Sequence, residues 1–181
     1  MLLSEDHIAV QDTVRAYVRD RIAPQDMPEL EQWVLHRLAE LDEKVRSGYD
    51  AYDFQGVFQA VFAFATVDLS SFYFDIRKDA LYCDASDAPR RRAARTVLDI
   101  LHRCLCAWFA PVLVFTAEEA WLARFPDEDG SVHLLDFPLV PEGWKDQALA
   151  AKWARLRDLR RAVTGALERA RVAQEIGSSL Q

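Results

Sequence analysis

The chain has 181 residues, of which 51% are apolar and 28% are charged, a balance typical of a soluble globular protein that forms one domain. Its net charge of −7 and isoelectric point near 5.1 count against an autonomous nucleic-acid binder, because that affinity comes mainly from cationic side chains. Six glycines and seven prolines without clusters exclude low complexity, disorder and a many-turned all-β fold, so we expect a mostly helical protein.

The first helix is predicted to begin at Ser4, to carry apolar residues at helical spacing as far as Ile22, and to stop at Pro24. Asp26 and Pro28 open a second helix, which Gly48 is expected to end. The apolar stripe of this second helix comprises Leu30, Trp33, Val34, Leu38, Leu41 and Val45.

A third, long helix follows a capping residue, Asp53, and is expected to be the central helix of the bundle. Asp68, Ser70 and Ser71 interrupt its apolar run and are expected to bend it, since serine side chains compete for helix backbone groups. A break follows between Tyr82 and Asp87. The predicted inner face comprises Phe54, Val57, Phe58, Val61, Phe62 and Ala65.

The fourth helix is predicted to start near Asp87 and Pro89 and to kink or end at Pro111. Thr116 and Glu119 have the spacing of a capping box, which predicts the start of a short helix through Trp121. On the fourth helix the apolar residues expected to be buried are Val97, Leu98, Leu101, Leu105 and Trp108.

Residues 125–140 are the least helical part of the chain, and at most one short strand or an extended strap is expected there. A last helix should run from Asp146 to about Arg171, with Leu149, Trp153, Leu156, Leu159, Val163 and Leu167 facing inward. The fold class is therefore all-α, a bundle of four to five long helices with one extended strap. Its core should gather around Trp33, Phe58, Phe62, Leu101, Leu105 and Trp153.

Charge is distributed unevenly along the chain. Residues 1–150 hold 15 Lys/Arg and 26 Asp/Glu, a net charge of −11, whereas residues 151–181 hold 7 and 3, a net charge of +4. A basic terminal helix thus follows an acidic body. Any contact with a polyanion must depend on local basic clusters rather than on the whole protein.

The three cysteines indicate a reduced, cytoplasmic protein, because their number is odd and Cys104 and Cys106 point to different faces of a helix. No basic-then-apolar leader and no uninterrupted apolar span of about 18 residues is present, so neither export nor a membrane is expected. Sequence patterns for phosphate loops, nucleophile elbows and metal ligands are also missing. We therefore expect no catalytic residue, no metal and no cofactor.

Three groups of residues are candidates for contact with RNA. The first comprises Tyr73, Arg77, Lys78 and Tyr82, where cations would meet phosphates and rings would stack on bases. The alternative is that this aromatic helix packs inward while its cations pair with neighbouring aspartates, Asp75 and Asp79.

The second group consists of arginines at the start of the fourth helix, an unfavourable place for cations because it opposes the helix dipole. That position favours an anionic partner, although a solvated surface run is the alternative. The third group is Trp33 with Arg37, one turn apart, which could hold a splayed base unless Trp33 belongs to the core. The arginines of the second group are Arg90, Arg91 and Arg92.

Four motifs resemble the anticodon-binding helical domain of isoleucyl-tRNA synthetases, over about the last five-sixths of the chain. They are VDLSSFYFDIRKDALY (67–82), RRRAARTVLDILHRCLCAWFAPVLVFTAEEAWLARFP (90–126), SVHLLDFP (131–138) and VTGALERARVAQEIGSSLQ (163–181). The resemblance implies a class Ia bundle over residues 26–181 that binds tRNA beside the remaining synthetase domains. It also implies no ligase reaction in this chain, since the two ATP-binding signatures of the class are absent. The positions matched to RNA contact are Trp33, Arg37, Tyr73, Arg77, Lys78, Arg90, Arg91, Arg92 and Arg95.

Residues 1–25, MLLSEDHIAVQDTVRAYVRDRIAPQ, instead resemble the first helix of acyl-CoA dehydrogenases. This resemblance implies a chimera joined near Asp26, with a foreign helix packed on the bundle. Two alternatives to a tRNA-binding domain therefore remain open. One is a structural chimera without tRNA binding, and the other is a helical module that binds protein partners through exposed apolar surface.

Overall fold

The computed structural model describes residues 22–126 and 130–177. The predicted first helix lies outside them except for Ile22. Within the described ranges every regular element is helical and no strand occurs, so the all-α prediction is confirmed. The chain divides into two compact units, Met1–Lys145 and Asp146–Gln181.

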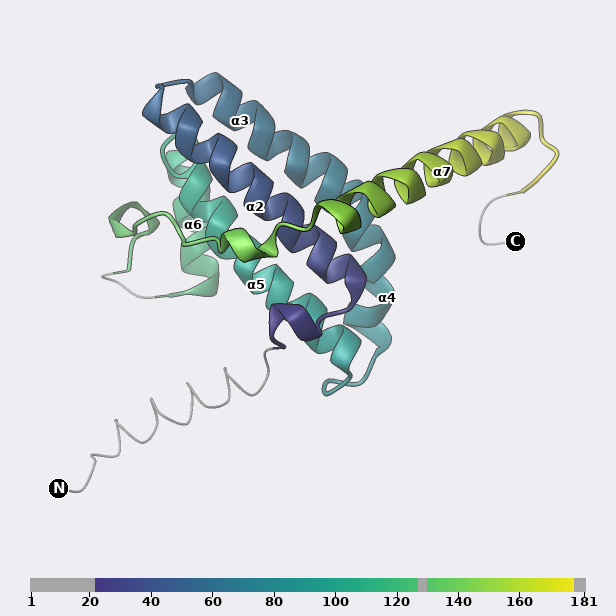
Figure 1. Cartoon of the computed structure of the whole chain (residues 1–181), viewed down its shortest axis with the longest axis horizontal. Helices are drawn as coiled ribbons and strands as arrows, with labels where there is room; N and C mark the ends of the chain where they lie inside the picture. The colour runs from purple at the N-terminus through teal and green to yellow at the C-terminus, as the bar shows by residue number, and fades with distance from the viewer. Residues whose placement is uncertain (1–21, 127–129, 178–181) are drawn as a thin grey trace. The chain divides into compact units, whose positions relative to one another are not determined.

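Helix α2 (Glu29–Asp50), preceded by the short 3₁₀ helix η1 (Pro24–Asp26), lies at the centre of the first unit, beside α3 and α5 (Figure 1). The prediction that Gly48 ends this helix is wrong, because α2 continues to Asp50. Gly48 serves another purpose: a Cβ there would lie 2.4 Å from Cγ2 of Val57. The absent side chain lets the two antiparallel helices approach closely.

The second long helix is continuous from α3 (Phe54–Ala63) through η2 (Phe64–Phe74) to α4 (Asp75–Cys83). Its predicted cap is confirmed, since the carboxylate of Asp53 accepts a hydrogen bond from the amide of Gly56 at 2.9 Å. The predicted inner face is only partly correct. Val57 and Val61 are buried, but Phe62 is 54% exposed, so it does not belong to the core.

The η2 segment has π-helical hydrogen bonding at the place where polar residues interrupt the apolar run. The hydroxyls of Thr66 and Ser71 donate to the carbonyls of Phe62 and Val67, four residues earlier, at 2.8 and 2.9 Å. Such bonds compete with the regular backbone ladder, which explains why the helix winds differently here rather than ending.

The 30-residue stretch Phe54–Cys83 is long and apolar enough to cross a membrane by length and composition alone. In this structure 39% of its most apolar window is buried. The core helix of a soluble protein passes the same test. The expectation that this protein has no membrane-inserted part therefore stays a prediction.

Helix α5 (Pro89–Phe109) starts at Pro89 as predicted. It ends at Phe109, two residues before Pro111, which agrees with the prediction that Pro111 stops it. Helix α6 (Val114–Arg124) differs from its prediction, because it begins at Val114 and no side chain caps it. Thr116 therefore lies inside the helix, and the capping-box interpretation is wrong. Glu118 makes the important contact instead, accepting hydrogen bonds from the hydroxyl of Ser131 and the amide of Val132 at 3.1 and 2.9 Å.

The strap after α6 contains two short 3₁₀ helices, η3 (Val132–Leu134) and η4 (Glu142–Trp144), joined by extended backbone. Arg46 on α2 donates to the carbonyl of Pro138 at 2.8 Å and so holds the strap on the bundle. A small apolar cluster fixes α6 and η3 against the end of α5. Its buried members are Cys106, Ala110, Ala117, Trp121 and Val132.

The second unit contains helix α7 (Gln147–Val172), which begins directly after Asp146 as predicted, and Asp146 caps it by accepting a hydrogen bond from the amide of Leu149 at 2.9 Å. None of its described residues is buried, however. The expectation that its apolar stripe faces inward, against the bundle, therefore stays a prediction. The most exposed members of that stripe are Leu156, Leu159, Val163 and Leu167.

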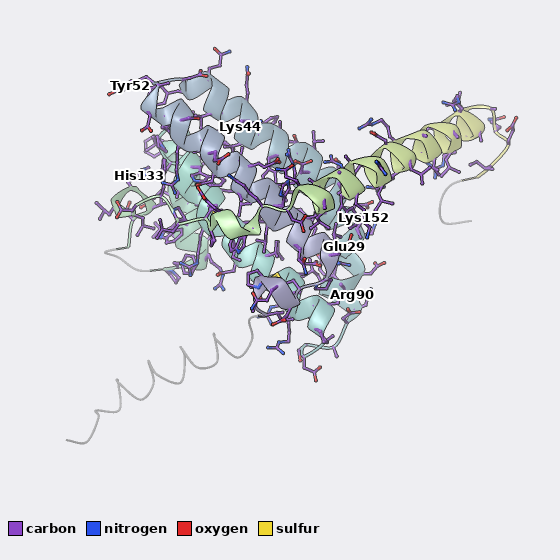
Figure 2. All side chains as sticks on the ribbon, viewed as in Figure 1. Glu29, Lys44, Tyr52, Arg90, His133 and Lys152 are labelled. Atoms are coloured by element: carbon purple, nitrogen blue, oxygen red, sulfur yellow. The ribbon has the colours of Figure 1, made fainter. Side chains whose placement is uncertain are left out.

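The two ends of the bundle in the first unit have different characters. Figure 2 shows Glu29 and Arg90 toward one end and Tyr52 at the other. Near Tyr52 the hydroxyl of Tyr49 donates to the carbonyl of Trp108 at 2.6 Å, which joins the ends of α2 and α5. The largest side chains that are fully buried between these ends include Trp108, Tyr73, Leu35, Leu38, Leu69 and Leu101.

Candidate nucleic-acid interface

Helix α4 divides the first candidate group between two faces. Tyr73 and Arg77 are four residues apart and point into the bundle, whereas Lys78 and Tyr82, also four residues apart, point outward. The side chain of Lys78 is 60% exposed and Tyr82 is 85% exposed. An exposed cation and an exposed ring on neighbouring turns remain available to a ligand.

The inward pair meets Glu31 of α2. Arg77 donates from Nε and Nη2 to the two carboxylate oxygens of Glu31 at 2.5 and 2.7 Å, and Tyr73 donates its hydroxyl at 3.1 Å. Glu31 and Tyr73 are fully buried, and the Arg77 side chain is only 11% exposed. Burial, with the charge of Glu31 added to it, raises the pKa of Tyr73 above its ordinary value.

These contacts place Tyr73 and Arg77 in a structural network rather than on the surface. Sequence analysis expected any ion pairs of this helix to involve Asp75 and Asp79. For Lys78 this is correct, since its ammonium lies 3.2 Å from Asp75. For Arg77 the partner is Glu31, 46 residues away, which no local pattern could identify.

Arg90 at the start of α5 is paired with Asp84 in the turn that precedes the helix. Its Nε and Nη2 donate to the two carboxylate oxygens at 2.8 and 2.7 Å, and Arg91 donates to the Asp84 carbonyl at 2.6 Å. The hydrogen bonds from Arg90 hold the pKa of Asp84 below its usual value. The sequence predicted an anionic partner for these arginines, and the structure places an aspartate of the same chain there.

Arg92 and Arg95 complete the basic start of α5. Arg92 is half-buried and Arg95 is exposed, and both make further contacts. Arg95 also borders an open groove of about 450 Å³ between η2, α5 and α6. The groove is lined mainly by apolar side chains, which are Phe74, Leu98, Leu101 and Leu105.

The third candidate group does not form a surface site. Trp33 is 2% exposed and packs edge-on against Phe72, with ring centroids 5.3 Å apart, so its faces are not available to a base. Arg37 donates from Nε and Nη2 to Asp68 at 3.3 and 3.2 Å and also pairs with Glu40. Its side chain is 37% exposed.

The residues that sequence reasoning missed are Glu31 and Asp84. In the sequence Glu31 is an ordinary acidic residue near the start of a helix, and only packing places it against Tyr73 and Arg77. The pairing of Asp84 with Arg90 could have been inferred from the sequence, because the two residues are only six positions apart and a short turn lies between them. In the part of the chain that the structure describes, no group of three His, Cys, Asp or Glu side chains could hold a metal ion.

Comparison with known proteins shows where this arrangement belongs. A family described as the anticodon-binding domain of tRNA ligase matches residues 31–181. Isoleucine–tRNA ligase of Ruegeria pomeroyi is 61% identical over 163 residues, which are 90% of this chain and 17% of the relative. The same enzyme of Agrobacterium fabrum is 56% identical over 162 residues, again 90% and 17%, and that of Gluconobacter oxydans is 56% identical over 156 residues, 86% and 16%.

The chain therefore spans about a sixth of the length of these relatives. The comparisons give no support for an acyl-CoA dehydrogenase segment or a chimera. They confirm the expected resemblance to the anticodon-binding domain of isoleucine–tRNA ligases and the all-α architecture that goes with it. The chain belongs to the family of anticodon-binding domains of tRNA ligases.

Proposed function

We propose that this chain binds the anticodon stem and loop of a tRNA for an isoleucine–tRNA ligase of which it is one domain. The contact is made by the RNA surface, defined here as Lys78, Tyr82, Arg90, Arg92 and Arg95. The observation that carries the proposal is the outward pair Lys78 and Tyr82, one turn apart on α4 and next in the chain to the basic start of α5. Unpaired loop bases stack on rings while cations hold their phosphates.

This assignment leaves out Trp33, Tyr73 and Arg77, because their side chains are buried or nearly buried inside the bundle. Because Arg77 is held by Glu31, α4 is fixed to α2 with one face inward. Lys78 and Tyr82 are then presented on the opposite face. Arg37 lies on α2, is paired with Asp68 and Glu40, and is not included.

Binding by the separate chain should be weak and strongly dependent on salt. The acidic body, with its net charge of −11 over residues 1–150, repels RNA at long range, so affinity must come from local contacts. Each phosphate contact adds about 0.7 to 0.9 to the slope of log affinity against log salt concentration. A surface with three to four cations should therefore give a slope of roughly 2 to 4.

An electrophoretic titration of the full chain with an isoleucine-accepting tRNA at two salt concentrations tests the proposal. Lys78→Glu should weaken binding and lower the salt slope. Lys44→Glu, which reverses an exposed charge on α2 outside the RNA surface, is the matched control. Equal affinity of Lys78→Glu and Lys44→Glu would show that the RNA surface is only a solvated face.

Cys83 offers an independent measurement. It is exposed between Tyr82 and Asp84, whereas Cys104 and Cys106 are buried. Burial raises the pKa of the Cys104 thiol to about 12 and also raises the pKa of Cys106, so neither forms the reactive thiolate near neutral pH. Alkylation at pH 7.5 should modify Cys83 alone, and bound tRNA should slow that modification. Unchanged alkylation at saturating tRNA would contradict the proposed surface.

Catalysis and tRNA charging would reside in the remaining domains of the ligase, in the cytoplasm. The end of the bundle near Tyr52 supports a second candidate function, docking of a protein surface. Tyr52 is 80% exposed, and further exposed apolar side chains occur at the start of α6 and in the strap. These residues are Phe115, Leu134 and Leu139, at 84%, 78% and 93% exposure. We assign this surface to another domain of the same ligase.

The origin of residues 1–25 remains a separate proposal. Their resemblance to acyl-CoA dehydrogenases suggests replacement of a helix that would otherwise contribute basic residues toward tRNA. Removing residues 1–21 tests this point. If the segment is foreign, tRNA affinity should stay unchanged on deletion, and a loss of affinity would contradict a foreign origin.

A further inference from the structure

We propose that Asp84 is an internal competitor of RNA that occupies the Nε–Nη2 edge of the Arg90 guanidinium in the free protein and must be displaced before an RNA phosphate can bind at that edge. The inference rests on the proposed tRNA-binding function. It assigns to this carboxylate the task of lowering the affinity of every RNA that places a phosphate at this edge of Arg90. The observation behind it is the two-point pairing of Arg90 with Asp84 at 2.8 and 2.7 Å.

The geometry of that pair is the geometry of a phosphate contact. A guanidinium presents parallel N–H donors that match two oxygens of a carboxylate or of a phosphate equally well. Asp84 uses Nε and Nη2 of Arg90, which form one of the two edges through which a guanidinium can bind a phosphate at two points, so a phosphate that approaches that edge meets Asp84. The two anions therefore compete for one edge and cannot both occupy it.

The backbone holds the competing carboxylate in place. Asp84 follows the last residue of α4, its backbone is extended, and its own carbonyl accepts a hydrogen bond from Arg91 at 2.6 Å. The Asp84 side chain is 20% exposed and that of Arg90 is 53% exposed. Arg90 is thus reachable from solvent on one side while Asp84 covers the other.

Displacement has an energetic consequence for selection among RNAs. An RNA that engages Lys78, Tyr82 and Arg95 and thereby positions a phosphate at Arg90 replaces Asp84 there, at the cost of breaking the ion pair. An RNA whose phosphates are not positioned at Arg90 leaves the pair intact. A competing intramolecular contact of this kind therefore lowers affinity most for the RNA that makes the strongest contact with Arg90.

Asp84→Asn tests the inference, with Asp87→Asn as the matched control. Both variants remove one negative charge from the same turn, and Asp87 is exposed. Titrations use an isoleucine-accepting tRNA and an oligouridylate, each at two salt concentrations. Asp84→Asn should raise tRNA affinity at least as much as oligouridylate affinity and should steepen the oligouridylate salt slope by up to about 0.7, the contribution of one phosphate contact in a single strand.

A double-mutant cycle with Arg90→Gln isolates the pair. If Asp84 acts through Arg90, the excess effect of Asp84→Asn over Asp87→Asn should vanish in the Arg90→Gln background. Far-ultraviolet circular dichroism confirms that each variant keeps its helices. An equal effect of Asp84→Asn and Asp87→Asn on both RNAs would overturn the inference. The Asp84 carboxylate would then act only through its long-range charge and not through its pair with Arg90.

That failure is distinguishable from failure of the proposed function. If the wild type binds tRNA and the two asparagine variants behave alike, tRNA binding stands and the role of Asp84 falls. If neither the wild type nor Asp84→Asn binds tRNA at low salt, the proposed function falls and the inference falls with it. Binding of oligouridylate by Asp84→Asn alone supports the inference.

Discussion

Arg77 on α4 and Glu31 on α2 form a two-point ion pair, with nitrogen–oxygen distances of 2.5 and 2.7 Å, inside a bundle where Glu31 has no exposed surface. The hydroxyl of Tyr73 completes the coordination of the carboxylate. A charged group without solvent is tolerated only when its hydrogen bonds are satisfied by such partners. This pair fixes the rotation of α4 and so decides which of its residues face outward.

Removing Glu31 alone should therefore destabilise the fold. Glu31→Ala leaves the Arg77 guanidinium largely buried without its carboxylate, and breaking a buried ion pair in this way costs about 3 to 5 kcal/mol. Urea unfolding followed by circular dichroism measures the change. Asp75→Ala removes the carboxylate of an exposed pair on the same helix and should cost at most about 1 kcal/mol. Comparable losses in the two variants would contradict the importance of the buried pair.

Tyr82→Ala should weaken tRNA binding without affecting the fold. Tyr82 is 85% exposed, and loss of one base–aromatic stacking contact reduces binding by about 1 to 3 kcal/mol. Tyr82→Phe should retain most of the affinity, because the ring rather than the hydroxyl stacks. Tyr52→Ala, at the other end of the bundle and 80% exposed, is the control. If Tyr82→Ala and Tyr52→Ala bind tRNA with equal affinity, Tyr82 is not a stacking residue.

Gly48→Ala should destabilise the protein, although alanine ordinarily stabilises a helix interior by about 0.5 to 1 kcal/mol relative to glycine. The new methyl group would lie 2.4 Å from Cγ2 of Val57, a buried side chain that cannot swing away. Overpacking of this kind costs about 1 to 3 kcal/mol, which exceeds the gain in helix propensity. Urea unfolding gives the difference.

Gly165→Ala provides the comparison for this substitution. Gly165 is also inside a helix, α7, but the nearest atom to its added Cβ is Nη1 of Arg169 at 3.7 Å, an ordinary contact. Helix content measured by circular dichroism should therefore rise slightly. If Gly48→Ala also raised helix content and stability, the close approach of α2 and α3 would not depend on this glycine.

The buried thiol of Cys104 should make stability fall as the solution becomes alkaline. Burial raises the pKa of Cys104 to about 12, whereas an unfolded cysteine titrates near 8.5, so above about pH 9 the unfolded chain has lost a proton that the folded chain keeps. The stability that the neutral Cys104 thiol contributes is fully present below the pKa of the unfolded cysteine. It declines as the pH rises from that value toward the pKa of the folded protein. Between pH 8 and 10 this group alone should account for about 1 to 2 kcal/mol.

Urea unfolding at pH 8 and pH 10 measures this effect, and Cys104→Ala separates it from other groups. Tyr49 and Tyr73 also have raised pKa values and contribute to the decline in both proteins. The decline should be smaller in Cys104→Ala than in the wild type. An identical decline in the two proteins would show that the Cys104 thiol titrates as an exposed group does.

Local sequence chemistry by itself predicted much of the helical framework. Asp53 and Asp146 cap their helices because a carboxylate just before the first turn reaches the free amides of that turn. Pro89 and Pro111 bracket α5 because proline begins a helix readily and cannot continue one. The acidic body, the basic end and the family resemblance of residues 31–181 also required nothing beyond the sequence.

The tertiary structure decided which side of each helix faces the core. Helical spacing alone shows that Tyr73 and Arg77 share one face and Lys78 and Tyr82 another, but it does not say which face is inward. Packing against Glu31, distant in sequence, settles that choice because a buried carboxylate needs a guanidinium and a hydroxyl. The same limit explains Phe62, since apolar residues at regular spacing are buried only where another element covers them.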